Sequence, residues 1–242
     1  MPATPRLILL PGLACDAALW RHQQPALAAA HPGQVLVADV HNRAASLSAM
    51  AALLLAEQPG PLLLAGCSMG GMLALEAARQ APQRVRGLAL LGTTARPDTP
   101  ELVALRRQAI TEFEAGRIEP LLRANLLFAF HPSHQARLAD DYIAMLHRAG
   151  ASGLIAQNRA VMYRVDLRPT LGAITCPTLV VAGADDLLTP PEHAREIAAA
   201  IPGALLRLLP ECGHMLTWEQ PAALNGLLLD WLGALRRPAV RP

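Results

Sequence analysis

The amino-acid sequence predicts an α/β fold in which helices flank a mostly parallel central sheet. Short apolar segments recur along the 242 residues, and stretches long enough for a helix separate them. Strands that alternate with helices form right-handed crossovers, and such crossovers build a parallel sheet. Two further features complete the pattern. A glycine-flanked serine directly follows one apolar segment, and one long interval contains no strand candidate. The expected strands are residues 6–10, 35–39, 62–67, 87–92, 178–183 and 204–209.

Helices are expected where apolar residues recur every three or four positions. A short helix capped by Asp16 should run through Trp20 and His22. The remaining core helices are expected at residues 44–57, in the apolar run after Gly71, and from about Pro221 to Leu235.

Composition and charge predict a protein with a large core that binds neither nucleic acid nor a membrane. Apolar residues make up 52% of the chain, whereas aromatic residues make up only 3%. The net charge of +2 comes from scattered arginines, and the basic group Arg236, Arg237 and Arg241 is typical of a solvated tail. The apolar run at 7–10 is too short for a signal peptide, and no later run approaches the roughly 20 residues of a membrane span. We therefore expect a cytoplasmic protein.

Residues 97–166 contain no strand candidate and interrupt the alternation. About seventy residues is far more than one crossover needs. The interval follows the fourth expected strand, at the sheet edge where parallel sheets bind their ligands. We therefore expect a helical cap at 97–166 and a core domain made of residues 1–96 and 167–242. The cap helices are expected at residues 101–114, 118–128, 134–149 and 153–163.

Ser68 is the candidate nucleophile. It lies in Gly66-Cys67-Ser68-Met69-Gly70, directly between an apolar strand and an apolar helix. This Gly-x-Ser-x-Gly pattern forms a sharp turn, because small residues two positions before and after the serine let strand and helix pack closely. The serine then takes a strained backbone conformation, which costs about 1–3 kcal/mol and lifts its hydroxyl above the sheet edge.

A serine hydroxyl needs a base to accept its proton, so a histidine and a carboxylate are expected at neighbouring strand ends. His214 follows the last expected strand, and of the eight histidines it alone occupies a loop of this kind. Two adjacent aspartates follow the fifth strand, and we choose Asp186 over Asp185. Asp186 would fix the imidazole tautomer while His214 shuttles the proton.

Two backbone N–H groups are expected to stabilise the negative charge of a tetrahedral intermediate. One belongs to Met69, at the start of the helix that follows the nucleophile. The other belongs to Leu13, in the turn Pro11-Gly12-Leu13 after the first strand. Both positions lie at the carboxyl ends of expected strands, as do the serine, the aspartate and the histidine.

These motifs together resemble the α/β-hydrolase superfamily, in particular its small cap-bearing esterases, lactonases and C–C bond hydrolases. The resemblance covers almost the whole chain. It rests on the Leu-Pro-Gly turn at 10–12, the elbow at 66–70, Gly-x-x-Asp at 183–186 and Gly-His at 213–214. The chain order serine, aspartate, histidine agrees with that fold. The resemblance implies a Ser-His-Asp mechanism through an acyl-enzyme, a core sheet with a helical cap, and no cofactor. The chain departs at Pro11, where many relatives carry histidine.

The expected pocket is mostly apolar, which suits a small-molecule ester or lactone with an apolar acyl or alcohol group. No cluster of metal ligands is spaced along the chain, so no metal is expected. Besides Leu13 and Met69, the residues expected to flank the site are Trp20, Phe128, Phe130, Met162, Leu187, Leu188 and Met215.

Other reactive or charged side chains adjoin these motifs. Cys15, Cys67 and Cys212 each lie within two residues of a predicted catalytic group, but they lack paired metal-ligand spacing and are expected to be reduced. Arg159 and Arg164 of the expected cap could receive a substrate carboxylate, although a surface position is the commoner role for such arginines.

The leading hypothesis is a serine hydrolase that cleaves a carboxylic ester of a small to medium, mostly apolar substrate. The same triad also serves lactonases, hydrolases of C–C bonds next to a carbonyl, and acyltransferases. A ligand receptor that keeps the fold without turnover is the alternative from another class. Both a monomer and a homodimer agree with the sequence.

Overall fold

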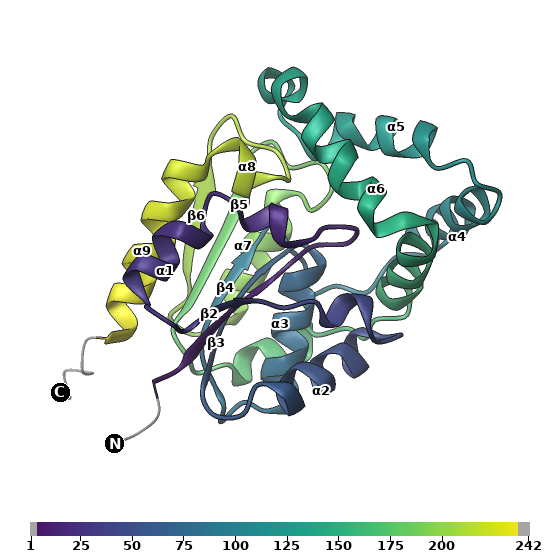
Figure 1. The fold of residues 1–242 in the computed structure, drawn as a ribbon. Helices are drawn as coiled ribbons and strands as arrows, with labels where there is room; N and C mark the ends of the chain where they lie inside the picture. The colour runs from purple at the N-terminus through teal and green to yellow at the C-terminus, as the bar shows by residue number, and fades with distance from the viewer. Residues whose placement is uncertain (1–3, 237–242) are drawn as a thin grey trace.

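The computed structural model describes residues 4–236, which form a six-stranded sheet with helices on both faces (Figure 1). Residues 1–3 and 237–242, and with them Arg237 and Arg241 of the predicted tail, lie outside the described part. All five strand pairings are parallel, which confirms the predicted sheet. The strand order is β2-β1-β3-β4-β5-β6. The strands are β1 (Arg6–Leu10), β2 (Val35–Val37), β3 (Leu62–Cys67), β4 (Val85–Leu91), β5 (Thr178–Gly183) and β6 (Leu205–Leu209).

Three strands differ from the prediction at their ends. β6 begins at Leu205 rather than at 204, and β4 ends at Leu91 rather than at 92. β2 stops at Val37, because Asp39 already precedes a short 3-10 helix. β4 begins at Val85, two residues earlier than predicted, because Val85 pairs with Leu62 before the register of the two strands shifts.

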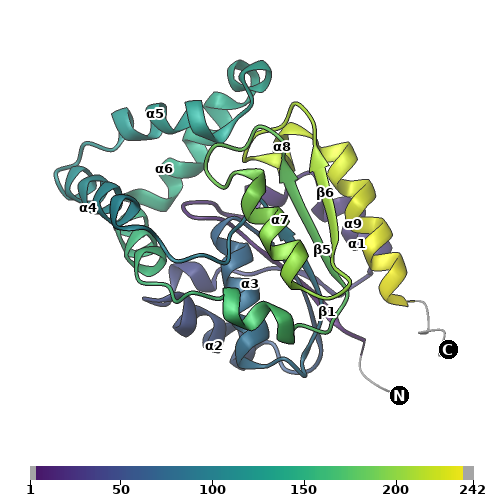
Figure 2. The same ribbon diagram turned by 180° about the vertical axis from the view of Figure 1, so that it is seen from behind.

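Helices cover both faces of the sheet, and the side chains of each strand alternate between two hydrophobic clusters. In β1, Leu7 and Leu9 belong to the cluster under α1 and α9, whereas Ile8 and Leu10 belong to the cluster under α2, α3 and α7. Figure 1 and Figure 2 show these two helical layers from opposite sides. The layers are built from α1 (Gln24–Ala30), α2 (Leu47–Glu57), α3 (Met69–Gln80), α7 (Pro191–Ala200) and α9 (Pro221–Arg236).

Short helices connect these elements. Asp16 caps the first of them, accepting a hydrogen bond from the Ala18 N–H at 2.8 Å, as predicted. The helix is a single 3-10 turn that ends at Trp20, so it does not reach His22. Ser46 caps α2, which therefore begins at Leu47 rather than at 44. The short helices are η1 (Ala17–Trp20), η2 (Val40–Asn42), η3 (Arg168–Ala173) and α8 (Leu216–Glu219).

Between β4 and β5 the chain forms three α-helices, the 3-10 helix η3 and no strand, and we call residues 97–166 the helical insertion. It lies beyond the carboxyl ends of the strands (Figure 1). The expected helices 134–149 and 153–163 are the two segments of α6, and Gly150 separates them with a non-helical conformation (φ 65°, ψ 172°). No helix within residues 4–236 combines the length and apolar character that a membrane crossing requires. The insertion consists of α4 (Pro100–Glu114), α5 (Glu119–Ala129) and α6 (Pro132–Met162).

Candidate active site

Ser68 lies at the turn between β3 and α3, with φ 53° and ψ −117°. A positive φ is uncommon for a residue with a side chain and stores about 1–3 kcal/mol of strain. Two hydrogen bonds hold the turn: the Ser68 N–H donates to Leu91 O at 2.8 Å, and Thr93 Oγ1 donates to Ser68 O at 2.7 Å. Ser68 is therefore fixed at the carboxyl edge of the sheet, next to the end of β4, and its side chain stays partly exposed.

The glycines of the elbow are required because backbone approaches backbone there. A Cβ atom at Gly66 would lie 2.1 Å from Gly70 O, and one at Gly70 would lie 2.0 Å from Leu10 O. Both distances are far below van der Waals contact, so a side chain at either position would push α3 away from the sheet.

His214 and Asp186 form a buried pair. His214 Nδ1 lies 2.8 Å from Asp186 Oδ2, and the two residues are 6% and 2% exposed. Asp186 Oδ1 accepts hydrogen bonds from the N–H groups of Leu188 and Thr189, both at 2.9 Å, and Thr189 Oγ1 donates to Oδ2 at 2.8 Å. Asp185 is exposed. The structure thus brings Asp186, rather than its neighbour, to the imidazole.

Each member of the pair shifts the pKa of the other. Burial alone would lower the pKa of His214, but the charge of Asp186, the hydrogen bond to it and the charge of Glu219 raise it above its ordinary value of 6.5. Burial alone would raise the pKa of Asp186, but the charge and hydrogen bond of His214, together with the bonds from Thr189, hold it below 3.8. Asp186 is therefore ionised at neutral pH and stabilises a protonated imidazole.

The end of β4 lies between this pair and Ser68. A Cβ atom at Gly92 would lie 3.4 Å from both Asp186 Oδ2 and His214 O. Leu91, the residue before Gly92, accepts the hydrogen bond from the Ser68 N–H. The hydrogen bonds of the described residues do not include one between the Ser68 hydroxyl and His214. Catalytic hydrogen bonds often form only when substrate binds, so Ser68 and His214 remain candidates for a catalytic pair.

The two expected oxyanion donors adjoin the elbow. Met69 is the first residue of α3, directly after Ser68. Leu13 follows Gly12, where a Cβ atom would lie 3.4 Å from both Cys67 O and Ser68 Cβ. The turn after β1 therefore packs directly against the serine, so Leu13 follows a residue in contact with Ser68 and Met69 follows Ser68 itself.

Glu219 is a functional candidate that the sequence analysis missed. Its carboxylate is fully buried and accepts hydrogen bonds from the N–H groups of Gly213 (3.0 Å), Met215 (3.1 Å) and His131 (2.8 Å). His134 Nδ1 lies 3.1 Å from the same group. Glu219 thus anchors the loop of His214 to the start of α6. The available signal was a lone acidic residue directly after Met215-Leu216-Thr217-Trp218, five positions beyond His214.

Thr189 was missed as well, although it contacts both members of the pair. Its hydroxyl donates to Asp186 Oδ2 at 2.8 Å and lies 3.3 Å from His214 Nδ1. A threonine three residues after the aspartate, within the loop that follows β5, was the available signal.

Comparison with known proteins identifies the family. The family model of the alpha/beta hydrolase fold matches residues 44–221. The chain belongs to the α/β-hydrolase family. This confirms the resemblance seen in the four sequence motifs, and with it hydrolase activity of the α/β-hydrolase type.

Relatives of this α/β-hydrolase carry several activities in their names. It is 29% identical to "Putative carbamate hydrolase RutD" of Klebsiella pneumoniae (strain 342) over 97% of this chain and 93% of that protein. It is 32% identical to 2-hydroxy-6-oxononadienedioate/2-hydroxy-6-oxononatrienedioate hydrolase of Cupriavidus pinatubonensis, over 69% and 61% of the two chains. The structure of a thermophilic esterase from Thermogutta terrifontis (malate bound) superposes with a TM-score of 0.85 and 25% identity, covering 98% of this chain and 92% of that chain.

The apolar residues expected around the site of the α/β-hydrolase fall into two groups. Trp20, Phe130 and Met215 are buried in the cluster under α1 and α9, at 0%, 2% and 3% exposure. Met162 is buried too, whereas the exposed residues are Phe128, Leu187 and Leu188. The residues named for the pocket therefore include both core and surface side chains, and their contact with a substrate stays a prediction.

The two arginines of the insertion are already engaged. Arg159 pairs with Glu114 at 2.8 Å. The side chain of Arg164 is 6% exposed and lies 2.6 Å from Asp98, so the expected surface position is wrong for this residue. Neither guanidinium is free to receive a substrate carboxylate.

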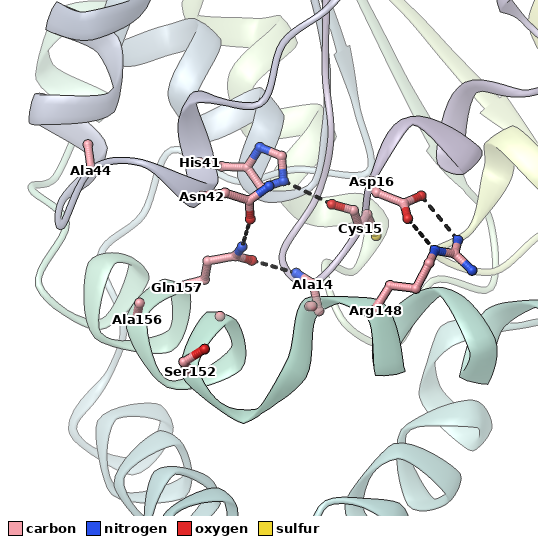
Figure 3. A pocket seen from close by; sticks show the side chains of 12 residues that line it. Ala14, Cys15, Asp16, His41, Asn42, Ala44, Arg148, Ser152, Ala156 and Gln157 are labelled. Carbon is pink, nitrogen blue, oxygen red and sulfur yellow. Dashed lines mark hydrogen bonds and ion pairs between the residues drawn. The ribbon is translucent and has the colours of Figure 1, made fainter.

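A cavity of about 430 Å³ opens beside the turn of Leu13, between η2 and α6 (Figure 3). Within residues 4–236 no three His, Cys, Asp or Glu side chains gather in a way that could hold a metal ion. The cysteines near the site are free thiols, and burial raises the pKa of Cys15 to about 12 and those of Cys67 and Cys212 as well. The cavity lining includes Ala14, Asp16, His41, Asn42, Arg148, Ser152 and Gln157.

Proposed function

We propose that this α/β-hydrolase is a serine hydrolase that cleaves a carboxylic ester of a small to medium, mostly apolar substrate through an acyl-enzyme. One observation carries the proposal: the strained Ser68 lies next to the end of β4, and the residue that follows β4, Gly92, lies next to the buried pair of His214 and Asp186. Strain at an exposed serine beside a paired imidazole is the arrangement that nucleophilic catalysis needs. The similarity to the Thermogutta terrifontis esterase supports the ester substrate.

In the proposed mechanism, Ser68 Oγ forms a bond to the ester carbonyl carbon while His214 Nε2 accepts the hydroxyl proton. The negative charge that develops on the carbonyl oxygen is stabilised by the N–H groups of Leu13 and Met69. When the C–O bond breaks, the leaving alcohol takes the proton from His214 and the acyl group stays on Ser68. Water then attacks the acyl-enzyme with the same proton transfers, and the acid is released. Asp186 remains ionised throughout.

We also assign the helical insertion at 97–166 as a cap over this site. Its position beyond the strand ends supports the assignment, as do the bonds of Glu219 to His131 and of Arg148 to Asp16. The four free cysteines suit the reducing cytoplasm.

A second candidate reaction is cleavage of a carbamate or of a C–C bond next to a carbonyl. The names of the Klebsiella pneumoniae and Cupriavidus pinatubonensis relatives favour it. Both reactions place negative charge on a carbonyl oxygen, so the same oxyanion donors would serve them.

These reactions can be compared by assaying the enzyme with a panel of substrates. The panel contains p-nitrophenyl esters of graded chain length, a p-nitrophenyl carbamate and a vinylogous 1,5-diketone. We expect ester turnover, which Ser68→Ala and Asp186→Asn each reduce by about 10⁴-fold or more. Asp185→Asn is the matched control, and it should stay within about threefold of the wild type because Asp185 is exposed. A higher kcat/KM for the carbamate or the diketone than for any ester would favour the second candidate. Ester turnover that survives in Ser68→Ala, or stoichiometric labelling without turnover, would contradict the proposal.

A further inference from the structure

A side chain of the helical insertion holds the turn that contains Leu13. Ala14 has a positive φ of 60°, and its N–H donates to Gln157 Oε1 at 2.6 Å. Gln157 lies on α6, 143 positions along the chain, and is 1% exposed. A buried amide that binds a strained backbone over this separation fixes the turn against the insertion.

A second layer of hydrogen bonds holds Gln157 and the far side of the turn. Gln157 Nε2 donates to Asn42 Oδ1 at 2.8 Å, so both ends of the amide are engaged. In η2, His41 Nε2 hydrogen-bonds with Cys15 O at 2.9 Å. Figure 3 shows the amide of Gln157 between Asn42 and the backbone of Ala14.

These bonds determine where the Leu13 N–H points. The Gly12 carbonyl and the Leu13 N–H belong to one planar peptide group, so fixing one fixes the other. The Cys15 N–H donates to Gly12 O at 3.1 Å. Gln157 holds the next peptide through the Ala14 N–H, and His41 holds Cys15. Rotation of the Leu13 peptide would therefore break bonds on both sides of it.

Ala14 and Cys15 of the turn are buried in a hydrophobic cluster, and polar contacts join the turn to α6. The cavity of about 430 Å³ separates the turn from part of α6. Besides Gln157, α6 reaches the turn through Arg148, whose Nε donates to Asp16 Oδ2 at 2.6 Å on the other side of the bend at Gly150. That pair is exposed and contributes little. The buried bond of Gln157 is the stronger of the two contacts.

We propose that Gln157 is a positioning residue that holds the Leu13 N–H in the oxyanion hole. The helical insertion would then set the geometry of catalysis as well as cover the substrate. The inference rests on the proposed role of Leu13, and it makes catalysis depend on a residue outside the triad, which acts through the backbone of the turn.

The test replaces Gln157 with residues of similar size. Gln157→Leu removes both hydrogen bonds, whereas Gln157→Glu keeps an acceptor for Ala14, and the amide of Asn42 can turn to donate to the second carboxylate oxygen. We expect Gln157→Leu to lower kcat for a p-nitrophenyl ester by about 10- to 100-fold, somewhat less than the loss of an oxyanion donor itself. KM should change less than threefold, and Gln157→Glu should stay within about fivefold of the wild type.

The affinity for a boronic acid inhibitor is a second measurement, and it would not change if Gln157 only stabilised the fold. The tetrahedral adduct of the inhibitor on Ser68 places an oxygen in the oxyanion hole, so Gln157→Leu should weaken its binding by about the same factor as kcat/KM. Asn158→Leu is the matched control. Asn158 is also a buried amide of α6, but it binds Arg106 and Leu154 rather than the turn. It should lower thermal stability comparably and leave kcat and inhibitor affinity unchanged.

Unchanged kcat in Gln157→Leu, or equal losses in Gln157→Leu and Asn158→Leu, would overturn the inference. If Gln157→Leu does not fold, Asn42→Leu decides. Asn42 is exposed, and Asn42→Leu removes the hydrogen bond to Gln157 Nε2. We expect kcat to fall less than in Gln157→Leu, and inhibitor affinity to fall by the same factor as kcat. An unchanged kcat would count against the role of Gln157. If Ser68→Ala keeps its activity, the proposed function fails instead. If Ser68→Ala is inactive while Gln157→Leu is fully active, only the role of Gln157 fails.

Discussion

At the scale of single residues, the site depends on charges that lie where water cannot screen them. Asp186 and Glu219 both raise the pKa of His214 against the effect of burial. Asp186 is in contact with the imidazole, whereas Glu219 binds the backbone on both sides of it. The two carboxylates therefore have separable effects: one pairs with the base, and the other positions its loop and adds to the field.

This arrangement predicts the pH dependence of the reaction. His214 must be neutral to accept a proton, so kcat/KM should rise with pH with a midpoint above 6.5. Glu219→Gln removes a negative charge that raises the pKa of His214, so the midpoint should move to lower pH. A pH profile of kcat/KM for the wild type and the variant measures the shift. Glu211→Gln, an exposed change in the same loop, is the control, and a midpoint for Glu219→Gln that stays or rises would contradict the prediction.

Sequence reasoning reached the residues at strand ends and missed those defined by distant partners. Ser68, Asp186 and His214 were found because each follows an apolar strand, and parallel strands end at one edge. Gln157 could not be found in this way, because its partner Ala14 lies 143 positions away and nothing local marks the pair. The expected pocket stays a prediction, because an apolar side chain such as Trp20 suits a core and a pocket equally well.

At the scale of elements, close backbone contacts set the position of the loops. The loop of His214 passes against the end of α5 and the start of α6, where the N–H groups of His214 and Met215 both donate to Ala129 O. A Cβ atom at Gly213 would lie 2.6 Å from His131 N and 2.7 Å from Phe130 C. Both are backbone atoms, which cannot move away cheaply.

Gly213→Ala should therefore destabilise the protein by about 1–3 kcal/mol and lower kcat/KM, because the adjacent His214 must shift. Gly226→Ala in α9 is the opposite case. Gly226 is exposed, and nothing lies within 4 Å of the added methyl group. It should stabilise the protein by about 0.5–1 kcal/mol and leave kcat/KM unchanged. Urea unfolding and ester kinetics on both variants measure these effects, and a Gly213→Ala protein as stable as the wild type would refute the clash.

The same contacts explain why element boundaries were only partly predictable. Gly150 was expected to separate two helices, since glycine commonly ends a helix. The structure confirms this break: α6 consists of two helical segments that meet at Gly150, whose φ of 65° and ψ of 172° are not helical and are essentially restricted to glycine. The bend lets Arg148 and Gln157 approach the turn of Leu13 from two directions, which is a tertiary requirement that no local pattern records.

At the scale of the whole molecule, the insertion and the sheet share one hydrophobic cluster. Leu7 and Leu9 of β1 belong to the same buried cluster as Phe113, Leu122 and Tyr142 of the insertion. The bonds of Glu219 to His131 and of Gln157 to Ala14 add polar links between the two parts. Removing the insertion would expose one side of this cluster to water. The insertion is therefore expected to fold with the core rather than as a separate unit.

Unfolding in urea should accordingly occur in one transition, although chains longer than about 150 residues often show intermediates. The three tryptophans offer a clean probe, because Trp20, Trp218 and Trp231 all lie outside the insertion. Their fluorescence reports the core, whereas circular dichroism at 222 nm also reports α4, α5 and α6. We expect the two signals to give the same midpoint. An insertion that unfolds on its own would lose helical signal at lower urea concentration while the tryptophans stay buried, and that result would also remove the support that the insertion gives to the turn of Leu13.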